Sequence, residues 1–322
     1  MIETDELLSI RAAELYYEED KTQDEIGRTL RLTRWKVGRL LAQAKANGFI
    51  RIEIVHPRAR RLALERRLRE ECGLKDAVVV STSGVDGDEE LQTRTAQAAA
   101  DYLGSLRPVP RTLGVSWGRT LHEVSTALPD GWARGVNVVQ INGGVSLNRR
   151  AGTAAATAVT IAHKAGGEAT LLPSPAILER AETKRAIEGD RAVSAVLDLA
   201  ASADAYVFSA GPADANSVLV DSGYLTAHDV AELVRAGAVG DVVGRYIDAA
   251  GAIVDPGLDA RTLGISHERL RSSPLSIAVI AGRSKHAAAR AVVASRLCTV
   301  LITDEESALS VLEPTAPQGR TP

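Results

Sequence analysis

Apolar positions recur at intervals of three and four in residues 22–47, TQDEIGRTLRLTRWKVGRLLAQAKAN. This spacing predicts two helices, each with one buried face. The apolar positions are Ile26 and Leu30 on the first helix and Trp35, Val37, Leu40 and Leu41 on the second. Residues 31–33 between them leave room only for a tight turn. Thr22 and Glu25 are spaced as a capping box for the first helix, and Thr33 is placed to cap the second.

A third helix and a short strand flank this pair. Residues 5–19 carry apolar side chains at helical spacing and are expected to cover the two helices. Asn47 and Gly48 tolerate the left-handed turn at a helix C-terminus, so the second helix is expected to end there. Residues 49–55, FIRIEIV, alternate apolar and polar side chains, which predicts a strand and hence a short wing.

Beyond residue 73, short apolar runs alternate with segments of helical periodicity. The expected strands are 77–81, 112–115, 136–141, 169–172, 205–209, 277–281 and 299–303. The expected helices are 89–103, one that begins at 120, 153–165, 183–188, 192–201, 285–295 and 305–312. Strands rich in Val and Ile that are separated by helices are typical of a mostly parallel open sheet with helices on both faces.

His56 and Pro57 break the chain before residues 58–72, which read as an amphipathic connecting helix. Its leucines suit pairing with a partner subunit and ordinary packing within the chain equally well, and both remain open. The fold class expected is an N-terminal all-α winged helix-turn-helix followed by a C-terminal α/β domain. The predicted parts are a winged helix-turn-helix domain at 1–56, a linker helix at 57–73, the α/β domain at 74–313 and a disordered tail at 314–322.

Positive charge is concentrated near the N-terminus. Residues 28–69 hold thirteen Lys or Arg and two acidic residues, a net charge of +11, whereas the whole chain carries −3 and the remainder therefore −14. If the second helix packs through its apolar face, Arg34, Lys36 and Arg39 point outward near its start, where a recognition helix enters the major groove. This distribution predicts DNA binding, with a helical interaction module as the alternative. The candidate DNA contacts are Gln23, Thr33, Arg34, Trp35, Lys36 and Arg39.

Composition narrows the class of protein further. The chain has 322 residues, 45% of them hydrophobic, which is enough for a small domain and a larger one. Cys72 and Cys298 have no His or Cys neighbours at ligand spacing, so we expect neither a zinc site nor a disulfide framework. No run of about eighteen apolar residues occurs, and the N-terminus is acidic, so we expect no membrane span and no signal peptide. These features favour a cytoplasmic protein without a metal or a cofactor.

Four loops that follow expected strands carry glycines and polar side chains. In an open sheet ligands bind beyond the carboxyl ends of the strands, so these loops are expected to converge on a small-molecule site. Residues 114–121, GVSWGRTL, suit a phosphate or a polyol because their glycines let the backbone approach a ligand and a helix N-terminus follows. The other loops are 140–144, 209–212 and 240–241. Lys285 starts a helix, where an ammonium is unfavourable unless an anion also binds.

These segments resemble the SorC family of bacterial sugar-binding transcriptional regulators, which includes deoxyribonucleoside and central glycolytic gene regulators. The matching motifs are TQDEIGRTLRLTRWKVGRLLAQAKANGFIRIEI, GVSWGRTL, QINGG, LLPSPA, GDVVGRYIDAAG, AGRSKHAAARA and LITDE, between about residue 7 and residue 312. The family implies a winged DNA-binding domain joined to an effector domain that is similar to ribose-phosphate isomerases and glucosamine-phosphate deaminases. It also implies binding to operator DNA, a homo-oligomer (dimer or tetramer), and a sugar, sugar alcohol or sugar phosphate held by these loops.

The resemblance carries over to individual positions. The residues that match the family's recognition helix are Thr33, Arg34, Val37 and Arg39. Gly38 stands where the family has a serine, Ser116 and Arg283 stand where it has glycines, and residues 209–211 replace its Gly-Ile-Gly. The loops and the resemblance together give these candidate effector-binding residues: Gly114, Ser116, Trp117, Gly118, Arg119, Thr120, Asn142, Gly143, Gly144, Gly211, Asp241 and Lys285.

The competing class is an enzyme that isomerises or deaminates a sugar phosphate, which needs an acid and a base aimed at a sugar carbon. The available groups are Asp204, Asp241, Asp248, Asp255, His163, His228, His267 and His286. None belongs to the clustered acidic motif of those enzymes, so we assign no catalytic residue. We expect instead that a bound metabolite favours one arrangement of the effector domains, which the linker helix transmits to the spacing of two recognition helices.

Overall fold

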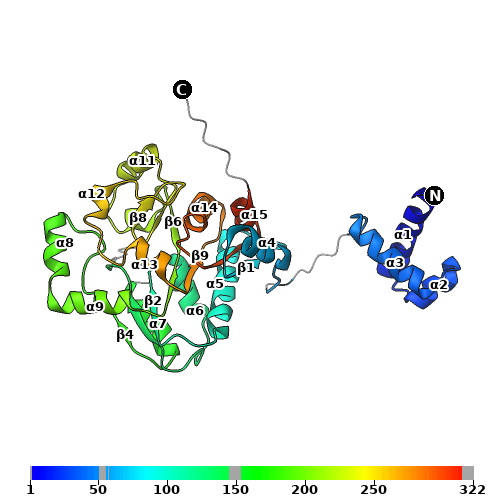
Figure 1. Cartoon of the computed structure of the whole chain (residues 1–322), viewed down its shortest axis with the longest axis horizontal. Helices are drawn as coiled ribbons and strands as arrows, with labels where there is room; N and C mark the ends of the chain where they lie inside the picture. The colour runs from blue at the N-terminus through cyan, green and yellow to red at the C-terminus, as the bar shows by residue number, and fades with distance from the viewer. Residues whose placement is uncertain (1, 51–55, 57, 145–153, 314–322) are drawn as a thin grey trace. The chain divides into compact units, whose positions relative to one another are not determined.

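The computed structural model describes residues 2–50, 56, 58–144 and 154–313. The chain divides into two compact units, Met1–Val55 and His56–Pro322 (Figure 1). The sequence placed the end of the first domain at residue 56. The expected wing strand lies mostly outside the described residues, and its first two residues, Phe49 and Ile50, are not in a strand. The expected disordered tail, 314–322, also lies outside them.

The described part of the first unit consists of three helices around a small core. They are α1 (Ile2–Tyr17), α2 (Gln23–Leu30) and α3 (Arg34–Ala46). Thr22 forms the predicted capping box with Glu25, and the Thr33 hydroxyl accepts the Lys36 N–H at 3.3 Å at the start of α3. Arg31 ends α2 in the left-handed conformation, which lets three residues complete the turn. The buried side chains are Ala12, Ala13, Leu15, Ile26, Val37, Leu40, Leu41 and Ala44.

Trp35 was wrongly grouped with the buried face of α3. Its side chain is 89% exposed, whereas Val37 and Leu40 are buried. Residues two positions apart in a helix point to different sides, so Trp35 cannot share the face of Val37. The indole lies instead one turn before Arg39, which is also exposed and is one of the predicted DNA contacts.

The second unit is built on a seven-stranded parallel sheet, in the order β1, β10, β9, β5, β2, β3, β4. The strands are β1 (Asp76–Val80), β2 (Thr112–Val115), β3 (Asn137–Gln140), β4 (Ala169–Thr170), β5 (Ala205–Phe208), β9 (Ser276–Val279) and β10 (Val300–Asp304). Consecutive crossovers bring their carboxyl ends to one edge. This is the α/β sheet that the alternation of apolar runs and helical segments predicts.

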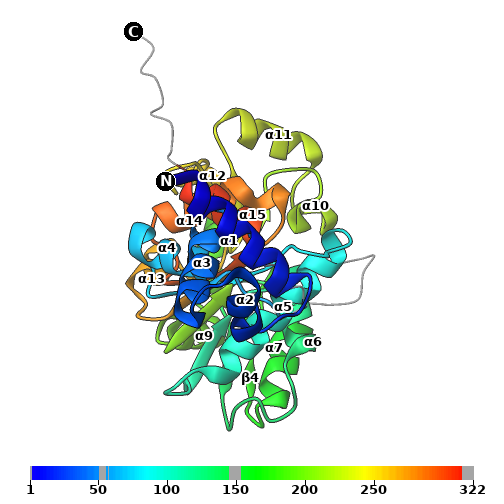
Figure 2. The ribbon, with the colours of Figure 1, turned by 90° about the vertical axis from the view of Figure 1, so that its right-hand side faces the viewer.

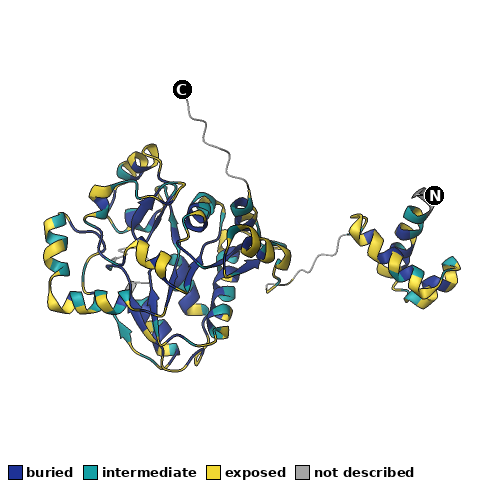
Figure 3. Ribbon diagram, viewed as in Figure 1, coloured by how far each residue is buried: buried dark blue, intermediate teal, exposed yellow. Residues whose placement is uncertain are grey.

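Helices cover both faces of this sheet (Figures 1 and 2). One face is packed by α5 (Asp88–Ser105), α6 (Arg119–Ala127) and α7 (Ala154–Lys164). The other is packed by α4 (Leu62–Cys72), α9 (Arg191–Ala201), α13 (His267–Ser272), α14 (His286–Ala294) and α15 (Glu305–Leu312). Successive side chains alternate between the two cores, with Val78 in one and Val79 in the other. The strands are accordingly buried over most of their length, except for the half-buried edge strand β4 (Figure 3).

A second, three-stranded antiparallel sheet stands beside the first. It comprises β6 (Ala210–Pro212), β7 (Gly240–Val242) and β8 (Arg245–Ile247), and the helices in this part of the chain are α8 (Ala181–Glu188), α10 (Val218–Asp221), α11 (Ala227–Arg235) and α12 (Pro256–Asp259). Val243 and Gly244, with φ of 49° and 84°, form a two-residue hairpin turn that reverses the chain between β7 and β8.

Helix α4 belongs to the body of the second unit rather than to a free linker. Leu68 is fully buried against the sheet. The Glu65 carboxylate, 3% exposed, accepts the Val79 N–H of edge strand β1 at 3.0 Å and pairs with Arg60 at 2.7 and 2.8 Å. The carboxylate thereby satisfies an N–H that an edge strand leaves without a partner strand. The chain that enters from the first unit is fixed at Arg60 by the same carboxylate.

We expect Glu65→Ala to lower the free energy of unfolding of the second unit by about 1–3 kcal/mol, because the Val79 N–H is left buried and unpaired. Urea unfolding of the full chain measures this change. Glu71→Ala on the same helix removes only an exposed pair with Arg67 and should leave the free energy of unfolding close to that of the wild type. Equal losses in the two variants would contradict the role given to Glu65.

Candidate functional site

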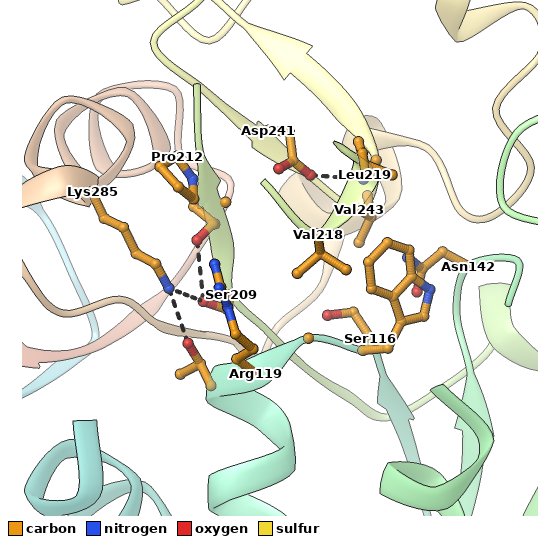
Figure 4. Close-up of a pocket in the computed structure, with 16 residues that line it drawn as sticks. Ser116, Arg119, Asn142, Ser209, Pro212, Val218, Leu219, Asp241, Val243 and Lys285 are labelled. Carbon is orange, nitrogen blue, oxygen red and sulfur yellow. Dashed lines mark hydrogen bonds between the residues drawn. The ribbon is translucent and has the colours of Figure 1, made fainter. Parts of the chain in front are cut away.

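A cavity lies between the carboxyl ends of the parallel strands and the small sheet. Loops after β2, β3, β5 and β9 reach it from the main sheet, and the β7–β8 hairpin and α10 close it from the other side. Its lining residues are Ser116, Trp117, Gly118, Arg119, Thr120, Asn142, Ser209, Ala210, Gly211, Pro212, Val218, Leu219, Asp241, Val243, Gly244 and Lys285. Figure 4 shows Lys285 and Arg119 on one side of the cavity, Asn142 on the other and Asp241 above them.

The structure brings together nine of the twelve effector-binding residues that the sequence predicts. The three that do not line the cavity are Gly114, Gly143 and Gly144. A Cβ on Gly114 would lie 2.5 Å from the Tyr206 ring, and a Cβ on Gly143 would lie 2.2 Å from the Pro175 carbonyl oxygen. These glycines are needed for close packing of the chain, and the sequence alone does not distinguish that need from close approach to a ligand.

The turn at Asn142 holds a neighbouring wall of the cavity in place. The Trp117 indole N–H donates to the Gly143 carbonyl at 2.7 Å, and the Gly144 N–H donates to the Ser174 carbonyl at 2.7 Å. Asn142 itself is 2% exposed, and its side-chain oxygen has no hydrogen-bond partner among the described residues. A buried acceptor of this kind costs about 1–3 kcal/mol unless a bound molecule donates to it.

One side of the cavity is cationic. The Lys285 ammonium donates to the Thr120 hydroxyl at 3.0 Å and lies 3.5 Å from the Ser209 hydroxyl. Burial, followed by repulsion from the Arg119 guanidinium, lowers the pKa of Lys285 to about 8. Helix α6 also begins here: Gly118 is its N-cap and supplies no side-chain cap, so the first amides of the helix face the same space. Positive charge and amide donors therefore converge on one point.

The opposite side offers acceptors. The Asp241 carboxylate accepts the Gly244 N–H at 3.2 Å, inside the hairpin turn. Burial raises the pKa of Asp241 to about 6, against the opposing effects of that hydrogen bond and of Lys285. A Cβ on Gly211 would lie 2.0 Å from the Asp241 carboxylate, so only glycine at this position of β6 leaves room for it.

Several lining residues were missed by the sequence. Val218 and Leu219 lie on α10, a four-residue helix too short to give a periodic signal. Val243 has a positive φ, which is strained for a β-branched side chain and recurs at functional sites. Ser209 lies in a loop that the sequence did single out, but only its glycine was proposed as a contact.

The candidate DNA contacts also lie together, on the first unit. Gln23, Thr33, Arg34, Trp35, Lys36, Gly38 and Arg39 line one shallow depression at the start of α3. Lys36 is tied to Asp5 of α1 at 3.0 Å, and Arg34 lies 3.8 Å from Asp24. All six predicted residues are therefore on one surface, although Lys36 also links α3 to α1 through its ion pair with Asp5.

The groups proposed for catalysis are mostly occupied elsewhere. Asp204 accepts the N–H groups of Arg111 and Thr112, and Asp255 caps α12. His267 contacts the Val242 carbonyl at 3.0 Å, and burial lowers its pKa to about 4. Of the four aspartates considered, Asp241 alone lines the cavity. Within the described ranges, no three His, Cys, Asp or Glu gather as metal ligands, and no helix is long and apolar enough to cross a membrane.

Comparison with known proteins identifies the family to which this chain belongs. A family model described as a putative sugar-binding domain matches residues 56–313. The deoxyribonucleoside regulator of Bacillus subtilis is 30% identical over 310 residues, covering 95% of this chain and 97% of that protein. The chain belongs to the SorC family of sugar-binding transcriptional regulators. The resemblance predicted from the sequence is therefore confirmed.

Further relatives match this SorC-family chain over most of its length. The sorbitol operon regulator of Klebsiella pneumoniae is 28% identical over 309 residues, covering 95% of this chain and 98% of that protein. The crystal structure of full-length SorC from the same organism superimposes with a TM-score of 0.72 at 28% identity, covering 95% of this chain and 98% of that one. The chain is thus a transcriptional regulator with a sugar-binding domain, and the homologues are named as regulators rather than as enzymes.

The Asp241 carboxyl gives a test of the cavity's electrostatics. Its pKa of about 6 in the folded chain exceeds the value of 3.8 for an unperturbed carboxyl, so folding stability falls as pH rises through this window. We expect Asp241→Asn to be more stable than the wild type at pH 7.5, by at most about 3 kcal/mol, and to lose this advantage at pH 4. Thermal unfolding at both pH values measures the difference. Asp130→Asn, at an exposed loop position, is the matched control.

Proposed function

We propose that the cavity of the second unit binds a polyhydroxylated metabolite with an anionic group at one end, and that this ligand controls binding of operator DNA by the first unit. The observation that carries the proposal is the buried Asn142 side-chain oxygen, which has no hydrogen-bond partner among the described residues and lies across the cavity from the Lys285 ammonium. The Asn142 oxygen can accept a hydrogen bond from a donor such as a hydroxyl, and the Lys285 ammonium attracts an anion. A sugar phosphate or a phosphorylated sugar alcohol supplies both.

The orientation of the ligand follows from the two sides of the cavity. Its anionic end lies against Lys285, Arg119 and the first amides of α6, where charge-assisted hydrogen bonds are strongest. Its hydroxyls donate to Asn142 and Asp241. Relatives support a polyhydroxylated ligand, since they include a deoxyribonucleoside regulator, a sorbitol operon regulator and, in Brucella abortus, an erythritol catabolism regulatory protein.

For the first unit, we propose that α3 enters the major groove of DNA. Operators read by such helices have paired half-sites, so the chain acts as a homo-oligomer, a dimer or a tetramer. Gln23, Thr33, Arg34, Trp35, Lys36 and Arg39 supply the contacts. The excess of positive charge in this part of the chain supports contacts to phosphates.

The ligand signal has a continuous route to the chain that leads to the first unit. Lys285 ends the short 3-10 turn η1 (Arg283–Lys285), and the preceding Gly282 N–H donates to the Asp304 carboxylate at 2.8 Å. Asp304 is 1% exposed and caps α15. The next residue, Glu305, accepts from Arg61 at 2.6 Å. A ligand that moves η1 therefore acts on the segment just before α4.

Replacing Lys285 tests the anionic end. We expect Lys285→Met to weaken binding of a phosphorylated polyol by about 10–100-fold, the size of one charge-assisted hydrogen bond, and binding of the free polyol by less than about threefold. Calorimetric titration with erythritol, sorbitol and deoxyribose, each with and without a terminal phosphate, measures both effects. Arg283→Ala is the control, since this exposed cation lies on the same turn outside the cavity lining. Similar losses with and without the phosphate would contradict the orientation.

Replacing Glu305 tests the route. We expect Glu305→Gln to retain ligand affinity and DNA affinity but to reduce the ligand-induced change in DNA affinity, commonly 5–150-fold, to less than about threefold. Fluorescence anisotropy with labelled duplex, with and without ligand, measures it. Glu306→Gln removes the same charge from an exposed position of the same helix turn and should respond like the wild type. A full ligand response in Glu305→Gln would exclude this route.

A further inference from the structure

Trp35 combines an unusual position with unusual exposure. It is the second residue of α3, and at 89% it is the most exposed large hydrophobic side chain among the described residues. The core of the first unit forms without it, from Val37, Leu40 and the helices that pack on them. An indole presents a large apolar area together with one N–H donor. Exposure of so large an apolar area to water is unfavourable, and a binding partner that covers the indole removes this cost.

The surroundings of Trp35 select the kind of partner. Arg34 and Arg39 flank it, and all three residues line the same depression. Gly38, one turn further on, has no side chain, and the Gln23 amide oxygen lies 3.4 Å from the place where a Cβ would be. Ala42 continues the exposed face with a methyl group only. The indole therefore projects beyond its neighbours, with cations on both sides and small residues behind it.

A helix in the major groove meets stacked bases through their edges, not their faces. Among these edges only thymine presents an apolar group, its C5-methyl, and it places an O4 acceptor beside that methyl. The ring of an indole can contact the methyl group, and its N–H can donate a hydrogen bond to O4. A position so early in a recognition helix is where base contacts are made.

We propose that Trp35 is a specificity-determining residue that contacts the C5-methyl group of one thymine in each operator half-site. This inference rests on the proposed role of α3 in DNA binding, to which it adds the base that is read. Arg39 then supplies binding energy through phosphate or guanine, while Trp35 distinguishes thymine from the other bases at its position. Gln23, Arg34, Lys36 and Arg39 in the depression carry amide or charged groups, and Gly38 has no side chain. Thr33 offers a methyl group, but its hydroxyl accepts the Lys36 N–H at the start of α3.

The test uses the full-length protein and a duplex selected by it from a random-sequence pool. Each thymine of one half-site is replaced in turn by deoxyuridine, which removes only the methyl group. For the wild type, we expect one replacement to weaken binding about three- to fivefold, as the loss of one buried methyl predicts. For Trp35→Ala, the same replacement should have no effect, because the group that contacts the methyl is gone.

Arg39→Ala is the matched variant on the same face of α3. It should weaken binding to all duplexes and lower the salt dependence by about one counterion, while the deoxyuridine effect remains. If the wild type shows no methyl dependence, or if Trp35→Ala retains it, the inference about Trp35 is wrong while the loss in Arg39→Ala still supports α3 as the DNA-binding helix. If neither variant changes DNA binding, the proposed role of α3 itself fails. Helix content by circular dichroism confirms that both variants are folded.

Discussion

The buried ammonium of Lys285 sets the chemistry of the effector domain. Among the described residues its hydrogen-bond partners are the hydroxyls of Thr120 and Ser209, which offer dipoles but no compensating charge. An ion moved from water into such surroundings loses several kcal/mol of hydration. The pKa of Lys285, lowered to about 8, expresses that loss. On the proposed function, an anionic ligand supplies a compensating charge, so the desolvation of Lys285 favours anions over neutral ligands.

Asp241 shows the same imbalance with the opposite sign, because burial raises the pKa of its carboxyl to about 6. The two groups share the cavity without a hydrogen bond between them that would relieve both. On the proposed function, a ligand with an anion at one end and hydroxyls at the other stabilises the ammonium and the carboxylate together. Both protein groups are ionised above the raised pKa of Asp241 and below the lowered pKa of Lys285, and in that range such a ligand meets both charges.

Local sequence patterns were enough to predict much of the fold and part of the site. The capping box at Thr22 and the strand-loop-helix order around Gly118 depend on neighbours in sequence, and the structure forms both as predicted. The role of Gly143 depends on Pro175, thirty-two positions away, and the hairpin at Val243 depends on pairing between β7 and β8. Packing between residues so far apart leaves no periodic trace, and β7 and β8, of three residues each, are too short to show one. Trp35 was counted as buried because an apolar residue near a helical stripe resembles its members, although its angle on the helix places it outside.

The packing of the second unit limits where a ligand can cause movement. Strands β9 and β10 are buried along their whole length, and close-packed interiors switch between discrete arrangements rather than deform. The turn η1 is different, because a three-residue 3-10 helix has weaker hydrogen bonding than the sheet beside it. Its link to Asp304 lies at the start of α15, next to the Glu305 to Arg61 pair. A change at Lys285 therefore reaches the entry of α4 through side chains at the sheet's edge, while the sheet itself stays fixed. On this proposal, the same rigid core that holds the ligand site in shape also directs its signal toward the DNA-binding unit.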